Sequence, residues 1–168
     1  MTPAKQDQGI TIQITNNFAD LRVSLSGLRK LVKAVCSRFA GQGTPSTRYH
    51  IGIAIVDDSQ IRELSSRFLS RKAVTDCLSF DLSDEEASQA RGRNCKTLEL
   101  AVNGQMAARQ AALRGHSSQA ELALYITHAL LHNFGFDDST GSGARKMHQA
   151  EDEVLQELGY GPVYNKGR

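Results

Sequence analysis

Two histidines and two neighbouring aspartates provide the side chains best suited to chemistry. His128 and His132 lie four positions apart in an apolar segment, so in a helix both imidazoles would share one face, one turn apart. Gly135 follows where that helix should end, and the left-handed backbone that glycine tolerates lets the chain reverse. Either Asp137 or Asp138 would then return to the histidine face. Three protein ligands with a fourth position open to water are typical of a catalytic zinc site.

The same histidine spacing occurs in zinc peptidases, which gives a second interpretation. In those enzymes the residue after the first histidine is a glutamate that acts as the general base, whereas this chain has Ala129. A metallopeptidase therefore ranks below other hydrolytic functions. A bound zinc ion would lower the pKa of its water towards ~7, so we predict that the metal-bound water is the catalytic group. Histidine pairs also arise by chance, but Gly135 and the two aspartates favour the metal site.

Length and composition limit the remaining possibilities. The 168 residues suffice for one hydrophobic core, so we predict a single hydrolase domain over 1–168 with flexible ends at 1–8 and 161–168. The net charge of +2 does not indicate nucleic-acid binding, so such a partner would require a local basic patch. The sequence shows neither a signal peptide nor an apolar run near the roughly 20 residues that span a membrane. With three widely spaced cysteines and no disulfide pattern, we expect a cytoplasmic protein without a membrane partner.

Hydrophobic periodicity predicts the elements that position the site. The strand at 49–56 has small or apolar residues on both faces, so we expect both faces to be covered. A capping box at Ser118–Glu121 should open the helix that carries the two histidines. These elements favour an α+β fold with a small mixed four-stranded sheet, about five helices and the metal site on a central helix. The expected strands are 10–14, 49–56, 77–82 and 98–102, the expected helices are 21–39, one from Asp57 or Asp58 through Phe68, one capped by Asn103 that runs to Arg114, 119–134 and 144–158, and the expected loops are 41–46 and 83–96.

Other histidines and a basic run are weaker candidates. His116 lies just before the histidine helix, where a local hydrogen bond and a role in catalysis are both reasonable interpretations. His148 should be a solvated surface residue, and His50 should have a structural role at the start of a strand. A basic run is usually a solvated surface, but beside a hydrolytic site it could bind phosphate. Its members are Arg67, Arg71 and Lys72.

The histidine segment resembles a known family. Residues 128–138 read HALLHNFGFDD, which is similar to the signature HGxLHLxGYDH of the YbeY family of bacterial endoribonucleases. Further motifs in the same order extend the resemblance over most of the chain. They are Val56-Asp57-Asp58 with Ile61 and Leu64 (VDDxxIxxL), Thr75 to Phe80 (PTDVLSF), Gly115-His116-Ser117 with Glu121-Leu122 (GHSxxxEL), and Met147 with Glu151 (MxxxE).

The resemblance implies a function and a set of ligands. It implies a zinc-dependent endoribonuclease that acts in ribosomal RNA maturation and ribosome quality control, with ribosomal RNA and the small ribosomal subunit as partners. The family's first two zinc ligands fall on His128 and His132, and its third, a histidine, falls on Asp138. A carboxylate also binds zinc at ~2.0–2.2 Å, although its charge could favour a harder ion such as manganese. Asp137 matches the family's own aspartate.

Two departures from the family pattern bear on activity. The family's arginine in YRGKD falls on Leu69, and its aspartate in LGDIVI falls on Leu100, unless Glu99 compensates from the other face of that strand. Arg67, Arg71 or Lys72 could replace the missing arginine. The departures predict a weakened enzyme, or alternatively a non-catalytic ribosome-associated factor with the same fold.

Overall fold

Four strands form one mixed sheet in the order β1-β2-β4-β3 in the computed structural model, which describes residues 9–40 and 47–164. β1 (Ile10–Asn16), β2 (Arg48–Val56) and β4 (Cys95–Asn103) are parallel, whereas β3 (Cys77–Asp81) pairs antiparallel with β4 at the edge. The parallel strands require crossover connections, and helices provide them. The α+β fold and the four-stranded sheet expected from the sequence are therefore confirmed.

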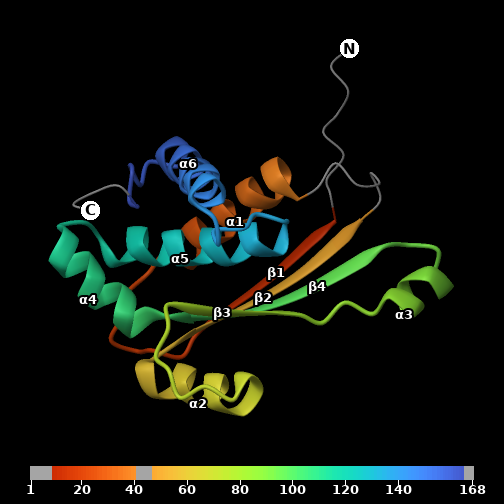
Figure 1. Ribbon diagram of the computed structural model, residues 1–168, viewed down its shortest axis with the longest axis horizontal. Coiled ribbons are helices and arrows are strands. Elements are labelled where there is room, and N and C mark those ends of the chain that lie inside the picture. The colour runs from red at the N-terminus through yellow and green to blue at the C-terminus, as the bar shows by residue number, and fades with distance from the viewer. Residues whose placement is uncertain (1–8, 41–46, 165–168) are drawn as a thin grey trace.

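Helices cover the two faces of this sheet unequally (Figure 1). α1 (Leu25–Phe39), α4 (Gly104–Arg114) and α5 (Ser118–Asn133) pack on one face, and α6 (Gly141–Glu157) packs outside α5. α2 (Asp58–Leu69) lies on the opposite face, and the short α3 (Glu85–Ala90) lies at the far end between β3 and β4. The described residues thus contain six helices, one more than expected, because the predicted loop at 83–96 includes α3 and the start of β4.

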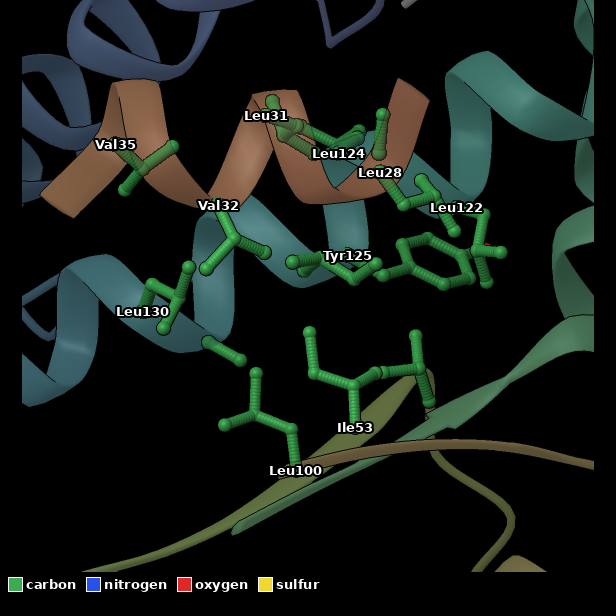
Figure 2. Packing of buried hydrophobic residues seen from close by; sticks show 14 of the residues in the cluster. Leu28, Leu31, Val32, Val35, Ile53, Leu100, Leu122, Leu124, Tyr125 and Leu130 are labelled. Atoms are coloured by element: carbon green, nitrogen blue, oxygen red, sulfur yellow. The ribbon is translucent and has the colours of Figure 1, made fainter. Parts of the chain in front are cut away.

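α5 is the central helix of the main core. Leu122, Ile126 and Leu130 are fully buried. Side chains from α1 and from the sheet pack around most of the helix (Figure 2). From the sheet, Ile53 and Leu100 point toward α1 and α5. A helix packed on several sides needs apolar residues around its circumference, which explains the strongly apolar sequence of α5.

Side-chain caps fix the helix starts near the site. Asp57 and Gln60 form a capping box at the start of α2, and Asn103 caps α4 as predicted. The expected capping box at Ser118–Glu121 is wrong, because Ser117 is the cap of α5 and accepts a hydrogen bond from the backbone N–H of Ala120. That shift by one residue removes Glu121 from the capping position.

Two further expectations about exposure need correction. α2 covers only the C-terminal half of β2. The N-terminal half of β2 is therefore exposed on the face that carries His50, whereas both faces were expected to be covered. At the other end of the chain, Val163 is 1% exposed, so residues 161–164 pack against the fold instead of forming part of a free tail. The flexible segments expected at 1–8 and 165–168 and the loop expected at 41–46 lie outside the described residues. Within the part of the chain that is described, no helix combines the length and apolarity needed to cross a membrane.

Candidate metal centre

The last two turns of α5 bring two imidazoles together. His128 and His132 lie one helical turn apart, with their ring centroids 4.6 Å from each other and their planes nearly perpendicular. Their Nε2 atoms are 3.0 Å apart. The His128 side chain is 20% exposed and that of His132 is 37% exposed, so the pair lies where the buried helix reaches solvent. This position suits a metal ligand that a substrate must reach.

The chain reverses direction after α5, as predicted from Gly135. Gly135 has φ +94° with no atom near the position of a Cβ, so the left-handed turn costs little at this residue. The backbone N–H of Phe136 then donates to the carbonyl of Leu131 at 3.0 Å. The ring of Phe136 packs edge-on against Phe39 of α1, with centroids 5.6 Å apart. This anchor directs the following residues back toward the histidines.

Asp138, and not Asp137, reaches the two imidazoles. The Asp138 carboxylate oxygens lie 3.6 Å from Nε2 of His128 and 3.6 Å from Nε2 of His132. The Asp137 carboxylate turns away and accepts hydrogen bonds from the backbone N–H and hydroxyl of Ser139, which hold its pKa below the usual range. Of the two aspartates, this turn places Asp138 beside the imidazoles and Asp137 beside Ser139.

The three donor atoms fit one small divalent cation. One ligand atom from each residue lies within 4.8 Å of the other two. The two Nε2 atoms are 3.0 Å apart, and each lies 3.6 Å from a different oxygen of the Asp138 carboxylate. Ligands bound tetrahedrally at ~2.0–2.2 Å lie roughly 3.3–3.6 Å apart, which is close to these values. Two imidazoles and one carboxylate are also a donor set that zinc accepts. The residues present therefore match a site with three protein ligands.

A buried carboxylate fixes the orientation of His128. Glu151 of α6 is fully buried, and its Oε1 accepts a hydrogen bond from Nδ1–H of His128 at 2.6 Å. The hydrogen bond leaves Nε2 of His128 with its lone pair facing His132 and Asp138. Metal-binding histidines commonly donate the other ring nitrogen to a carboxylate in this way. Glu151 is thus a positioning residue for the centre.

His148 contacts the second oxygen of Glu151, so the expectation that it is a solvated surface residue is wrong. Its Nδ1 lies 2.8 Å from Oε2 of Glu151, while its ring stacks on Tyr164 with centroids 3.3 Å apart. The His148 side chain is only 20% exposed. The buried carboxylate of Glu151 thus has one histidine partner on each oxygen, as a buried charge requires.

From the sequence, Glu151 was assigned to a family motif but to no role in the site. The signal was present in the pattern of α6, because Glu151 lies four positions after Met147 and four before Leu155, both of which are buried. A carboxylate on the apolar stripe of a helix requires a buried partner. Asp76, directly before β3, was likewise given no role. Its negative charge raises the pKa of His128.

The surroundings shift the pKa of His128. Burial lowers it, but the hydrogen bond and charge of Glu151, with smaller contributions from Asp76 and Asp138, raise it above the usual value overall. Three carboxylates therefore create a negative field around this imidazole. In the absence of a metal, this field favours a cation at the position where the ligands converge.

His116 lies away from the centre. Its ring is 5% exposed and hydrogen-bonds through Nε2 to the buried Glu121, which also accepts from Arg114 at 2.7 Å. The residue precedes α5, whereas His128 comes ten residues after Ser118, or ~15 Å along the helix. Of the two interpretations, the structure supports local hydrogen bonding for His116, which joins the connection between α4 and α5 to Glu121.

The basic run is not gathered at the histidines. Arg67 lies on α2, on the opposite face of the sheet from α5, with its guanidinium 5.8 Å from the ring centroid of Phe68. Arg67 and Lys72 line a hollow on the outer side of α2 together with Arg62. Arg71 is exposed in the connection that leads from α2 to Asp76. The structure thus places Arg67 and Lys72 beside α2, across the sheet from the helix that carries the histidines.

The two departures from the family pattern have different surroundings. Leu69 ends α2 and is 46% exposed, so an arginine would fit there without disturbing the core. Leu100 is 3% exposed and packs beneath α5 (Figure 2). Glu99 points to the opposite face, where its carboxylate lies over Gly52. It is therefore separated from the histidines by the sheet and does not replace an aspartate at position 100.

Comparisons with known proteins show what the chain is similar to. The profile of the family described as endoribonuclease YbeY matches residues 13–159. The endoribonuclease YbeY of Moorella thermoacetica is 31% identical over 150 residues, which cover 87% of this chain and 96% of the relative. That of Desulforamulus reducens is 31% identical over 147 residues, with 87% and 96% covered. The solution structure of TM1509 from Thermotoga maritima shares the fold, with a TM-score of 0.54, 22% identity, and 88% and 90% of the two chains covered.

Proposed function

The chain belongs to the YbeY family of endoribonucleases, and we propose that it is a metal-dependent endoribonuclease that acts on ribosomal RNA. The proposed role is in ribosomal RNA maturation and ribosome quality control in the cytoplasm, with the small ribosomal subunit as partner. Zinc is the proposed cofactor, one ion per chain, and manganese is a reasonable substitute because one ligand is a carboxylate.

The convergence of His128, His132 and Asp138 is the observation that supports this proposal most directly. The three donor atoms lie within 4.8 Å of one another at the point where α5 meets solvent. Zinc held there would supply Lewis acidity for attack on a phosphodiester. Glu151 would keep His128 in the tautomer that leaves Nε2 free, and the buried side of α5 would hold both rings in place. The exposed side of His132 and Asp138 leaves room for RNA.

A cleavage assay with purified protein tests the proposal. Structured and single-stranded fragments of ribosomal RNA would be incubated with zinc, with manganese and with a chelator. We expect cleavage with metal, loss of cleavage with chelator, and loss in the His128→Ala and His132→Ala variants. Asp137→Asn is the matched control, since Asp137 lies in the same turn but faces Ser139. Cleavage that persists in chelator or in both histidine variants would contradict a catalytic metal.

A non-catalytic ribosome-associated factor is the second candidate. The exposed Leu69 favours it, because this position lacks the positive charge that would contact phosphate in the family pattern. This candidate predicts binding to the small ribosomal subunit without RNA cleavage under any metal. A Leu69→Arg variant separates the two proposals, since a weakened enzyme would gain activity and a scaffold would not.

A metallopeptidase has less support. Ala129 follows the first histidine and is 2% exposed, so this position offers neither a base nor access to solvent. A peptide-hydrolysis screen that detects zinc-dependent turnover would restore this alternative.

A further inference from the structure

The open face of the sheet contains a basic cavity that is separate from the metal centre. Its volume is about 490 Å³, and it lies between β2, β4 and the connection that follows α3. Its lining includes Arg48, His50, Leu82, Asp84, Arg91 and Arg93. Because His50 and Thr97 occupy the strand face opposite the core residue Ile51, this cavity and α5 lie on opposite faces of the sheet.

Strand pairing and one turn bring the arginines together. Arg48 at the start of β2 pairs with Cys95 at the start of β4, and its backbone N–H donates to the carbonyl of Asn94 at 2.9 Å. Gly92 has φ +62°, a left-handed conformation that turns the chain after α3 and places Arg91 and Arg93 on either side of the bend. Segments more than 40 residues apart in the sequence thus line one hollow.

These three arginines outnumber the single acidic residue in the lining, Asp84. In the described part of the chain, no carboxylate forms an ion pair with Arg48, Arg91 or Arg93, whereas Arg38 and Arg109 both pair with acids. Guanidinium groups that face one cavity without such pairs repel each other, and an anion relieves that repulsion.

Two carboxylates limit the extent of the positive region. Asp84 lines the cavity, but its Oδ1 accepts from the backbone N–H of Ala87 at 2.9 Å as the cap of α3. Further along the same face, the Glu99 carboxylate lies over Gly52. The cavity therefore has an excess of positive charge that ends at Glu99, which limits where an anionic chain would lie.

We propose that Arg48, Arg91 and Arg93 bind backbone phosphates of RNA in this cavity, as a second binding surface on the sheet face opposite the metal centre. This inference rests on the proposed function, which supplies RNA as the ligand. Guanidinium groups bind phosphate oxygens in pairs, and the volume exceeds that of one phosphate and falls within the range of small-ligand pockets. Leu82, 60% exposed in the same lining, offers an apolar surface to a nucleotide base. With a net charge of only +2, the chain needs such a local patch to hold RNA.

Salt-dependent RNA binding tests this assignment without requiring catalysis. Binding of a fluorescent single-stranded RNA would be followed by anisotropy in chelator, between about 50 and 200 mM KCl. The Arg48→Ala/Arg91→Ala/Arg93→Ala variant should bind more weakly. Its slope of log affinity against log salt should fall by about 2, because each phosphate that an arginine no longer neutralises accounts for ~0.7 of the slope. The control is Arg29→Ala/Lys30→Ala/Lys33→Ala, which removes the same charge from exposed positions of α1 on the other side of the sheet. Its slope should stay near that of the unmodified protein.

The possible outcomes separate this proposal from the nuclease proposal. An equal slope for the cavity variant and the unmodified protein, an equal reduction in the α1 control, or no RNA binding by the unmodified protein would overturn the phosphate site. A selective reduction in the cavity variant supports it even if metal-loaded protein cleaves no RNA, in which case only the nuclease proposal fails. If the triple variant does not fold, Arg91→Ala/Arg93→Ala provides the test, because both side chains are exposed and outside regular elements.

Discussion

Glu151 holds His128 through a hydrogen bond of 2.6 Å between its Oε1 and Nδ1 of the imidazole. The carboxylate comes from α6, and the imidazole from the solvent-facing end of α5. Because the second oxygen of Glu151 faces His148 at 2.8 Å, the carboxylate is fixed from both sides. The proposed metal centre thus depends on a residue that is not one of its proposed ligands.

Glu151→Gln should weaken zinc binding by about 10- to 100-fold, the usual effect of losing a carboxylate behind a histidine ligand. The amide keeps an acceptor for one histidine only and carries no charge to increase the basicity of His128. Zinc affinity would be measured by competition with a chelating dye. Glu157→Gln is the control on the same helix, since that side chain is 66% exposed. Unchanged zinc affinity in Glu151→Gln would mean that Glu151 only supports the fold.

Asp138→Asn should reduce zinc affinity by more than the ~100-fold upper effect of a positioning residue, because it removes a direct ligand. Asp138→His should restore tight binding, since a third imidazole also coordinates zinc. Isothermal titration of metal-free protein with zinc would measure both. Should Asp137→Asn have the larger effect, the turn would present the other aspartate to the metal.

Gly143→Ala should disturb the turn that carries the aspartates. A Cβ at this position would overlap the backbone carbonyl oxygen of Asp137, so the turn would have to move. The expected decrease is about 1–3 kcal/mol in the free energy of unfolding, accompanied by weaker zinc binding. Both would be measured, by urea denaturation and by zinc titration.

Gly141→Ala is the control in the same helical turn. A Cβ there would meet its nearest atom, Nη1 of Arg145, only at 3.6 Å. Stability should therefore stay unchanged or rise by about 0.4–1 kcal/mol, because alanine reduces the freedom of the unfolded chain. Equal decreases for Gly141→Ala and Gly143→Ala would contradict the steric explanation.

Asp58 should make stability depend on pH in the acid range. Its hydrogen bonds from Arg109, at 2.7 and 3.1 Å, lower its pKa despite partial burial. A lowered pKa in the folded state contributes stability above the unfolded value of about 3.9, and that stability disappears as the pH falls through the folded pKa. Asp58→Asn should therefore be less stable than the unmodified protein near neutral pH, and the difference should shrink below about pH 4. Urea denaturation across this range would measure it, and a constant difference at all pH values would argue against the ion pair.

Much of the site could be predicted because its signals are local. The spacing of His128 and His132 with the glycine at 135 needs only helix geometry, and the four strands follow from alternation. The capping residue of α5 was misplaced by one position because two serines, Ser117 and Ser118, are adjacent. The choice between Asp137 and Asp138 depended on how Ser139 folds back, which periodicity does not report.

Other features depend on the packing of distant segments. His148 looked like a surface residue because its partner Tyr164 and the carboxylate of Glu151 meet only in the folded chain. The basic cavity depends on the pairing of β2 with β4, which places Arg48 beside a turn that the sequence pattern marked only as a loop. Such sites are set by topology, so single-segment reasoning cannot find them.

The metal content of the purified protein is the most direct test of the proposed centre. Elemental analysis would compare the unmodified protein with the His128→Ala/His132→Ala variant after identical purification in zinc-containing medium. Stoichiometric zinc in the first and none in the second is the predicted result. Equal zinc in both proteins, or no zinc in the unmodified protein even after loading, would contradict a metal site formed by these residues.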